Sequence, residues 1–313
     1  MKTLAYQPFD PNNDYLINKQ RLMDKYQNDP TVKHWLTTIS NDIQVQKSIY
    51  EKNIFKIDQW IKSLQPCLNC QGYLQCPLAI KGQQPHLSYN GAFVENRFVQ
   101  CEYAKSYELN HAFMHNYLLN DYPFLSDYEI KDMRIFAQFG PIGANIVKQL
   151  NPFLTQYPLD RGLYLYGGLG TGKTVTAAIV ANAFAKKGYK VVLINIVSFI
   201  ESLKRCFDSK DSQAISNKLY ELKRTDLLII DDIGCENNSA WSRDDVLFNV
   251  LNYRMEHNKA TWFTSNLDFD ALRKHFTFNS NASEEAVKAA RLMERIETLT
   301  SPLLFQGFNI RHK

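Results

Sequence analysis

The chain lacks the features that mark secreted, membrane-spanning and disordered proteins. Its longest apolar runs are only four or five residues long, such as 191–194 and 227–230, and are far too short to cross a bilayer. The first residues lack the apolar core of a secretory signal. Its 313 residues are 45% hydrophobic and 22% charged, which is enough apolar material for packed cores. We therefore expect a soluble, cytoplasmic protein of about two domains with no membrane contact.

A strong charge bias is also missing. Lys and Arg number 36 against 32 Asp and Glu, which leaves a net charge of +4. Dedicated nucleic-acid-binding proteins are usually more basic than this. The balance permits contact with DNA but does not by itself predict it.

Cysteine is scarce, yet four of the six cysteines are close in the sequence. Cys67, Cys70 and Cys76 form one cluster, and Cys101 follows it. Cytosolic thiols stay reduced, and a Cys-x-x-Cys pair with two later cysteines has the spacing of a tetrahedral Zn²⁺ site. The alternatives are unrelated buried thiols, or His86 as a ligand in place of Cys101. We expect zinc, because a module this small gains folding free energy from a metal.

The first third of the chain is expected to be a small domain. Residues 14–64 repeat apolar side chains at three- and four-residue steps, which predicts helices. Around the cysteines this period is lost, and Asn90-Gly91 between apolar runs predicts a hairpin turn. Residues 1–105 are therefore expected to form a helical, zinc-binding domain. Residues 106–135, rich in Tyr, Asn and Asp, are expected to be a linker.

From residue 136 to residue 313, short apolar strands alternate with helical segments. Strands are expected at 163–166, 190–196, 227–230 and 261–264, and helices at 173–187, 198–208, 212–224, 242–257 and 284–298. Such alternation is typical of a parallel sheet with crossover helices. The predicted fold class is α/β, a P-loop sheet flanked by helices and preceded by the small domain.

The first of these strands runs into a glycine-rich loop. The loop fits the pattern G-x-x-x-x-G-K-[ST] without a mismatch, with Gly167, Gly168, Leu169, Gly170, Thr171, Gly172, Lys173 and Thr174. Glycines let backbone N–H groups converge on phosphate oxygens, and the next helix points its positive end at them. Lys173 would neutralise phosphate charge, and the Thr174 hydroxyl would bind Mg²⁺. A chance match is disfavoured by the strand before the loop and the helix after it.

Two later strands end in polar residues. Asp231 and Asp232 follow the strand at 227–230, where ligands bind in a parallel sheet. Asp231 would hold Mg²⁺ and Asp232 would act as the general base, although a solvated turn is the alternative. Asn266, after the strand at 261–264, would orient the attacking water or cap the next helix. Spacing alone does not separate these two roles for Asn266.

Arginines four residues apart mark the helix at 284–298. Arg291 and Arg295 belong to a solvated charged face, or one of them reaches the γ-phosphate of a neighbouring subunit. The residues alone favour the first reading. An Asn-Lys-x-Asp guanine signature is missing from the sequence, which favours ATP over GTP.

Taken together, these motifs resemble those of the bacterial DnaI helicase loaders. The similarity covers nearly the whole chain, and it is more distant to the DnaC loaders, which share only the ATPase half. It rests on the N-terminal cysteines and on residues 163–174, 228–234, 241–244, 263–266, 287–296 and 311–312.

The resemblance implies an AAA+ ATPase of the primosome that delivers the hexameric replicative helicase onto single-stranded DNA. It implies that Asn266 is a sensor-1 residue, that Arg295 is an arginine finger for a neighbouring protomer, and that Arg311 is a second sensor. It also supports zinc at the cysteines and docking of the helicase on the N-terminal domain. Most AAA+ proteins carry Glu where this chain has Asp232, and the shorter side chain predicts slow hydrolysis.

The helix at 198–208 is the candidate contact for single-stranded DNA. Phe199, Lys204, Arg205 and Phe207 supply charge and rings for backbone tracking and stacking. The alternative is an ordinary amphipathic helix with Phe199 in the core. Two other functions compete with helicase loading: a nucleotide-gated adaptor, and a transposition-type AAA+ DNA-binding ATPase, against which the cysteine module argues.

Overall fold

The computed structural model describes four stretches of the chain: residues 11–155, 161–277, 282–307 and 309–310. The chain divides into two compact units, Met1–Asn110 and His111–Lys313. Within the described stretches, no helix combines the length and the hydropathy that crossing a membrane requires.

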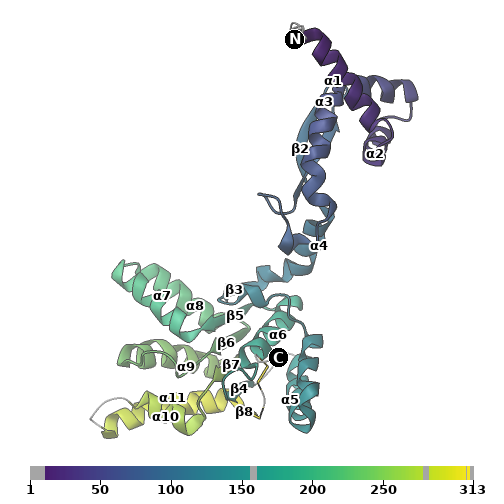
Figure 1. Ribbon diagram of the computed structural model, residues 1–313. Coiled ribbons are helices and arrows are strands. Elements are labelled where there is room, and N and C mark those ends of the chain that lie inside the picture. Colours follow the sequence, from purple (N-terminus) through teal and green to yellow (C-terminus); the bar gives the residue numbers. More distant parts are fainter. Residues whose placement is uncertain (1–10, 156–160, 278–281, 308, 311–313) are drawn as a thin grey trace, which may run out of the picture. The chain divides into compact units, whose positions relative to one another are not determined.

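The first unit consists of helices and one hairpin. Its elements are α1 (Pro11–Tyr26), α2 (Pro30–Ile39), α3 (Ile43–Leu68), the 3-10 helix η1 (Tyr73–Gln75), β1 (Gln83–Tyr89), β2 (Val94–Gln100) and α4 (Glu102–His111) (Figure 1). The predicted helices and hairpin are confirmed. The Asn90 side chain accepts hydrogen bonds from the N–H groups of Ala92 and Phe93, both at 3.0 Å, and so stabilises the turn between the strands.

Two tryptophans join the helices to the hairpin. Trp35 on α2 and Trp60 on α3 are buried, with ring centroids 5.9 Å apart. Their indole N–H groups donate to the carbonyls of Leu87 (2.9 Å) and Pro85 (3.1 Å) in β1. Each ring therefore buries a large apolar surface without leaving its N–H donor unpaired. This arrangement gives the first unit a core of its own.

The second unit is a six-stranded parallel sheet in the order β3-β5-β6-β7-β4-β8. This confirms the predicted α/β class with a parallel sheet flanked by helices. Its elements are the 3-10 helices η2 (Ala112–Asn116), η3 (Pro123–Leu125) and η4 (Ile130–Phe139), the π-helix η5 (Trp241–Phe248), the helices α5 (Gly140–Thr155), α6 (Lys173–Lys186), α7 (Ile196–Asp208), α8 (Ser212–Arg224), α9 (Asn249–Glu256), α10 (Phe269–Phe276) and α11 (Ala282–Leu299), and the strands β3 (Tyr117–Asn120), β4 (Gly162–Gly167), β5 (Val191–Asn195), β6 (Leu227–Asp231), β7 (Ala260–Ser265) and β8 (Thr300–Phe305).

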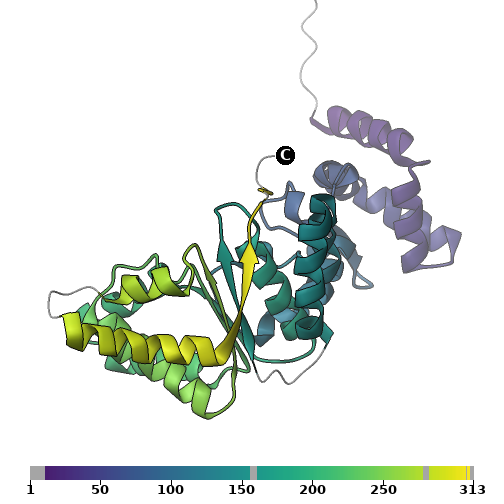
Figure 2. The ribbon, with the colours of Figure 1, turned by 90° about the horizontal axis from the view of Figure 1, so that it is seen from below.

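Helices cover both faces of this sheet. Figure 2 shows α5 and α6, in teal, on one side and the green to yellow helices α9 to α11 on the other. Successive residues of a strand point to opposite faces. Leu193 and Ile229 accordingly pack in the core beneath α5 and α6, whereas Ile194 and Ile230 pack in the core beneath α7 to α11. Both faces are buried, which explains the uninterrupted apolar runs in the central strands.

The stretch 106–135, expected to be a linker, contributes to the second unit. It contains η2, β3 and η3, and β3 pairs in parallel with β5, with Leu119 opposite Val192. The strand has four residues and an irregular register, so its sequence pattern is too short to be recognised. We therefore assign residues 111–135 to the second unit, whereas residues 106–110 belong to helix α4 of the first unit. Strand β8 was likewise not expected, and the helix predicted at 242–257 starts as the π-helix η5.

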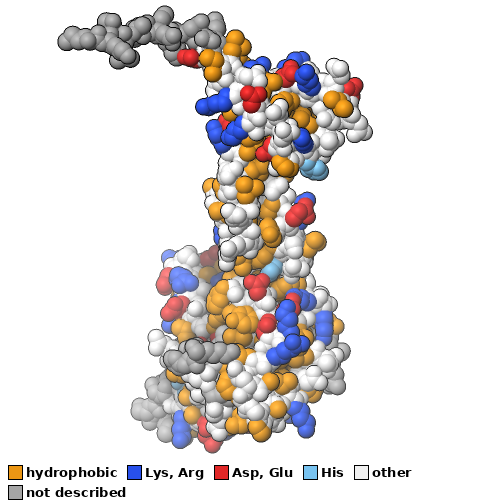
Figure 3. Space-filling view, turned by 45° about the vertical axis from the view of Figure 1, so that its right-hand side comes forward, with side chains coloured by type: hydrophobic (Ala, Val, Ile, Leu, Met, Phe, Trp, Pro, Cys, Tyr) orange, Lys and Arg blue, Asp and Glu red, His pale blue; other side chains and the backbone are white. Residues whose placement is uncertain are grey.

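Basic and acidic side chains are mixed on the face of the molecule that Figure 3 draws. This agrees with the small net charge of +4. A DNA contact on this face would therefore depend on a few local residues instead of a broad basic surface.

Candidate nucleotide-binding site

The glycine-rich loop lies between β4 and α6, as the sequence predicts. Gly170 and Gly172 have φ angles of +75° and +89°, which residues with a side chain rarely adopt. Helix α6 begins at Lys173, immediately after the loop. The loop and the helix start therefore offer backbone N–H donors and a partial positive charge to a phosphate group.

The Lys173 side chain is buried within this loop. Its ammonium donates to the carbonyls of Gly167 (2.9 Å) and Gly168 (2.8 Å) and to the side-chain oxygen of Asn266 (3.0 Å). Asn266 directly follows β7, so the bond joins the start of α6 to the end of β7. Asp268, and not Asn266, caps α10. The helix-cap alternative for Asn266 is therefore wrong.

The hydroxyl of Thr174 reaches the carboxylate of Asp231, to whose two oxygens it donates at 3.0 and 3.2 Å. Asp231 is fully buried at the end of β6, and this burial raises its pKa. The hydroxyls of Thr264 and Tyr122 also donate to the carboxylate and favour its charged form. Hydroxyl and carboxylate oxygens are ligands that Mg²⁺ prefers, so the chemistry of this pair fits the ion.

Asp232 has an unusual backbone. Its φ is +60°, in the left-handed region, which Asp tolerates better than most residues. The Asp232 N–H donates to the Thr264 hydroxyl at 3.0 Å, and its carboxylate accepts from the Asn195 amide at 3.3 Å. Asp232 and Asn266 line the same pocket as the loop. The left-handed turn therefore keeps Asp232 at the site, while Asp231 remains in the strand.

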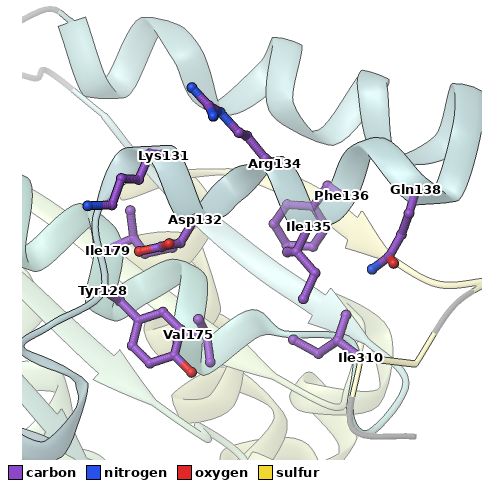
Figure 4. A pocket seen from close by; sticks show the side chains of 10 residues that line it. All are labelled: Tyr128, Lys131, Asp132, Arg134, Ile135, Phe136, Gln138, Val175, Ile179 and Ile310. Carbon is purple, nitrogen blue, oxygen red and sulfur yellow. The ribbon is translucent and has the colours of Figure 1, made fainter. Parts of the chain in front are cut away.

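Two adjoining cavities form the site. The one at the phosphate loop has a volume of about 190 Å³, and the other, of about 680 Å³, adjoins it (Figure 4). Val175 and Ile310 line both cavities. The lining of the larger cavity consists of Tyr128, Lys131, Asp132, Arg134, Ile135, Phe136, Gln138, Val175, Ile179 and Ile310. A mainly apolar cavity beside a phosphate loop is suited to a flat purine base.

The segment after β8 packs against the loop. The Ile310 N–H donates to the Gly170 carbonyl at 2.8 Å. A Cβ atom on Gly172 would lie 2.8 Å from the Ile310 side chain, and one on Gly170 would lie 2.6 Å from Asn309. A Cβ at either position would push the end of a neighbouring side chain aside, and the positive φ angles are the stronger reason for glycine there.

Four residues of the site were missed in the sequence analysis: Tyr122, Asn195, Thr264 and Ile310. Tyr122 and Asn195 contact Asp231 and Asp232 across 109 and 37 positions of the chain. Contacts between residues so far apart in the chain leave no recognisable pattern in the local sequence. Thr264 and Asn195, however, stand at strand ends next to β6, and that position could have indicated them.

Comparison with known proteins identifies the family. Residues 140–297 match the family model of the IstB-like ATP binding protein. Over 310 residues, the chain is 30% identical to the replicative helicase loader DnaI of Bacillus subtilis (strain 168), which covers 96% of this chain and 95% of that protein. The chain belongs to the DnaI family of replicative helicase loaders. It is thus an AAA+ ATP-binding protein.

Other DnaI and DnaC proteins are more partial matches. The replicative helicase loader DnaC of Escherichia coli (strain K12) is 23% identical over 132 residues, which span 42% of this chain and about half of that protein (53%). A crystal structure of DnaI has 33% sequence identity and a TM-score of 0.49, and it covers 58% of this chain and 93% of that one. A crystal structure from Streptococcus pyogenes serotype M3, titled a putative primosome component, has 28% identity and a TM-score of 0.48, and it covers 63% of this chain and 97% of that one.

In this DnaI family member, Arg295 is not among the described residues that line either cavity. Its guanidinium donates to Asn252 (3.2 Å) and Glu294 (2.5 Å). It also stacks 5.2 Å from the centroid of the Phe248 ring, beside Arg291 at 4.8 Å. Arg295 is therefore held on α11, away from the nucleotide site of its own chain.

Two other predictions of the sequence analysis have different outcomes. Arg311 lies outside the described residues. Phe199 is 4% exposed and packs in the sheet core with Leu203, so its expected role in stacking on DNA is wrong. Lys204 and Phe207, on the same helix α7, are exposed.

The four clustered cysteines lie in the first unit. Burial, and then the nearby thiols of Cys76, Cys70 and Cys101, raise the pKa of Cys67. The Gly82 N–H donates to the Cys76 sulfur at 3.4 Å and lowers the pKa of that thiol. Among the described residues, no group of three or more His, Cys, Asp and Glu is arranged to hold a metal ion. Zinc binding therefore stays a prediction.

Proposed function

We propose that this protein is a slow ATPase that delivers the hexameric replicative helicase onto single-stranded DNA. The observation that carries the proposal is that Lys173, Thr174, Asp232 and Asn266 line one pocket. Asp231 is buried directly behind it and accepts a hydrogen bond from Thr174. The similarity to a replicative helicase loader over almost the full length supports the helicase as the partner. The work would be done in the cytoplasm, at initiation or restart of replication.

Hydrolysis would use the residues at the three strand ends. The loop and Lys173 would hold the phosphates. Asp232 would accept a proton from the attacking water, whose oxygen bonds to the γ-phosphorus as the bond to the bridging oxygen breaks. Asn266, already bonded to the Lys173 ammonium, would orient that water. Because Asp232 is one methylene shorter than Glu and is held by Asn195, we expect turnover to be slow.

Thr174 and Asp231 would hold Mg²⁺. The ion, when bound, neutralises charge on the β- and γ-phosphate oxygens. The bond between the Thr174 hydroxyl and the Asp231 carboxylate already brings together two oxygen ligands of the kind the ion requires.

The proposal includes Zn²⁺ in the first unit, with Cys67, Cys70, Cys76 and Cys101 as ligands. The spacing of Cys67, Cys70 and Cys76 in the sequence, followed by Cys101, supports this set of ligands. His86, on β1, is the alternative to Cys101. The metal would supply folding free energy to a module with a small core. We propose that the helicase docks on this unit.

Assembly with further subunits would complete the site. Arg295 lies outside its own nucleotide cavities, which supports a role as an arginine finger toward the γ-phosphate of a neighbour. Arg311 would be a second sensor within the same chain. Self-association, or assembly on the helicase ring, would bring Arg295 to a neighbouring site.

Single-stranded DNA would contact the end of α7. Lys204 and Arg205 are exposed, and Phe207 is 68% exposed. Lys204 and Phe207 also line a shallow cavity of about 160 Å³ with Trp241. An exposed ring beside a basic residue is what base stacking and phosphate contact require.

Two alternatives predict different behaviour. An adaptor gated by nucleotide would need ATP bound but not hydrolysed. A transposition-type AAA+ ATPase would need only the ATP-binding half, whereas the similarity to the helicase loader extends through the N-terminal unit. That extension favours the loader.

The test is capture of the host's replicative helicase by the full-length protein, with and without ATP, followed by transfer of the helicase to single-stranded DNA. Lys173→Ala should abolish both ATP-dependent capture and transfer. Asp232→Asn should keep capture and lose transfer. Lys187→Ala, at the residue that follows the far end of α6, is the matched control. If Asp232→Asn transfers the helicase as the wild type does, the adaptor is the correct function.

A further inference from the structure

The Asp231 carboxylate has a hydrogen-bond donor from outside the ATP-binding motifs. The Tyr122 hydroxyl donates to Asp231 Oδ2 and accepts a hydrogen bond from the Asn195 amide at 3.1 Å. A phenol hydroxyl carries one proton that it can donate and lone pairs that accept, so Tyr122 can make both bonds at once. Tyr122 precedes residues 140–297, which match the ATP-binding family model.

The backbone around Tyr122 is fixed to the end of β5. The Asp121 N–H donates to the Leu193 carbonyl at 3.0 Å, and the Asp121 carboxylate accepts from the Asn195 N–H at 2.8 Å. The Tyr122 N–H donates to the Asn120 side chain at 2.8 Å. These bonds point the Tyr122 ring toward β6. The contact with Asp231 therefore depends on the position of the edge strand β3.

The two oxygens of Asp231 are held separately. Thr264 donates to Oδ1 and Tyr122 donates to Oδ2, while Thr174 lies between them at 3.0 and 3.2 Å. The Thr264 and Tyr122 bonds therefore determine the plane of the carboxylate. Thr174 would itself bind Mg²⁺, which would leave Thr264 and Tyr122 to orient the acid.

We propose that Tyr122 is a positioning residue for magnesium, and that its hydroxyl orients Asp231 from the segment that follows the first unit. The inference rests on the proposed role of Asp231 in holding Mg²⁺. It also makes the magnesium site dependent on β3: displacing this edge strand removes a donor from Asp231 and weakens magnesium binding.

The test compares ATP binding in Mg²⁺ and in EDTA by calorimetry on the full-length protein. The wild type should bind ATP more tightly in Mg²⁺. In Tyr122→Phe, the ratio of the Kd for ATP in EDTA to the Kd in Mg²⁺ should be about tenfold smaller than in the wild type, which is the loss typical of one hydrogen bond to a buried charge. The Kd in EDTA itself should stay within about twofold of the wild-type value. Tyr117→Phe is the matched control, because its hydroxyl comes from β3 but donates to Asn182, at 2.7 Å.

The outcomes separate the inference from the proposed function. A wild type without any magnesium effect would overturn the role of Asp231 and, with it, that of Tyr122. A normal magnesium effect in Tyr122→Phe would overturn the role of Tyr122 alone. Equal losses in the Tyr122 and Tyr117 variants would mean that both hydroxyls only stabilise the strand, which also overturns it.

A second measurement needs no variant. In the wild type with ATP, adding Mg²⁺ should slow the amide hydrogen exchange of residues 117–122, because an Asp231 engaged with the ion holds Tyr122 more firmly. Exchange that does not change with Mg²⁺ would contradict the proposal even where Tyr122→Phe folds poorly.

Discussion

The ammonium of Lys173 and the side-chain oxygen of Asn266 lie 3.0 Å apart. This bond connects the start of α6 to the end of β7. It therefore links Lys173, which would bind the phosphates, to Asn266, which would orient the attacking water. An incoming γ-phosphate would compete with Asn266 for the same ammonium. Asn266 is therefore placed to respond to the presence of that phosphate.

Asn266→Ala should impair hydrolysis more than binding. The variant keeps the loop and Lys173 but loses the amide that would align the water, so we expect kcat to fall roughly ten- to a hundredfold. Affinity for ATP should change by no more than about threefold. Single-turnover hydrolysis and equilibrium binding measure the two effects. A variant that loses binding and hydrolysis in equal proportion would show that Asn266 acts through Lys173 alone.

Ile310→Ala should weaken the binding of adenine nucleotides. The side chain lines both cavities, and truncation removes apolar contact area there. We expect a loss of about 1 kcal/mol, close to fivefold in Kd, for ATP and ADP alike. Calorimetry checks it. Val287→Ala, at an exposed position on α11, should bind as the wild type does. Unchanged affinity in Ile310→Ala would exclude this segment from the binding site.

The sequence predicts those parts of the site that lie on one continuous motif or at a strand end. The loop and the pair Asp231-Asp232 are of this kind. Carboxylates that follow an apolar strand lie at the carboxyl end of a parallel sheet, which is where ligands bind. Tyr122 could not be found, since its contact with Asp231 spans 109 positions and starts from a four-residue strand. The role of Phe199 could not be decided from the sequence, because an aromatic ring is equally suited to packing in a core and to stacking on DNA bases.

Arg295→Ala should leave ATP binding intact and reduce hydrolysis in the assembled complex. The side chain lies outside its own nucleotide cavities, so its loss should affect only the site of a neighbour. We expect the hydrolysis that the helicase stimulates to fall at least tenfold. Arg291→Ala is a close control, because Arg291 stacks on the same Phe248 ring. Equal losses of stimulated hydrolysis in the two variants would mean that both arginines act only by packing α11 against the Phe248 ring.

Removing metal should unfold the first unit without affecting the second. If zinc holds the cysteines, Cys76→Ser or a chelator should lower the melting temperature of that unit and abolish bound zinc. Binding of ATP by the other unit should remain. Cys235→Ser, at an exposed cysteine of the second unit, is the control. Metal analysis that finds no zinc in the wild type would end this proposal.

Arg243 is a charged residue with no solvent exposure. Its guanidinium donates to Asp244 at 2.6 and 2.8 Å and to Glu285 at 2.5 Å, and it joins η5 to α11. Arg243→Met should destabilise the second unit by about 3 kcal/mol, because it removes the closest cation of the buried Glu285 and leaves it the longer contact with Lys288, at 3.8 Å. Arg273→Met breaks an exposed pair with Glu297 and should cost less than about 1 kcal/mol.

The cost of Arg243→Met should also depend on pH. Hydrogen bonds from Arg243 lower the pKa of both Asp244 and Glu285 in the folded protein. A lowered carboxyl pKa gives stability that is fully present above the unfolded pKa, near 4, and that is lost as the pH falls through the folded value. The gap in unfolding free energy between wild type and variant should therefore be constant from about pH 7 to pH 5 and narrow below about pH 4. Urea titrations across this range measure the gap, and a gap that stays constant down to pH 3 would mean that Arg243 contributes packing and not charge.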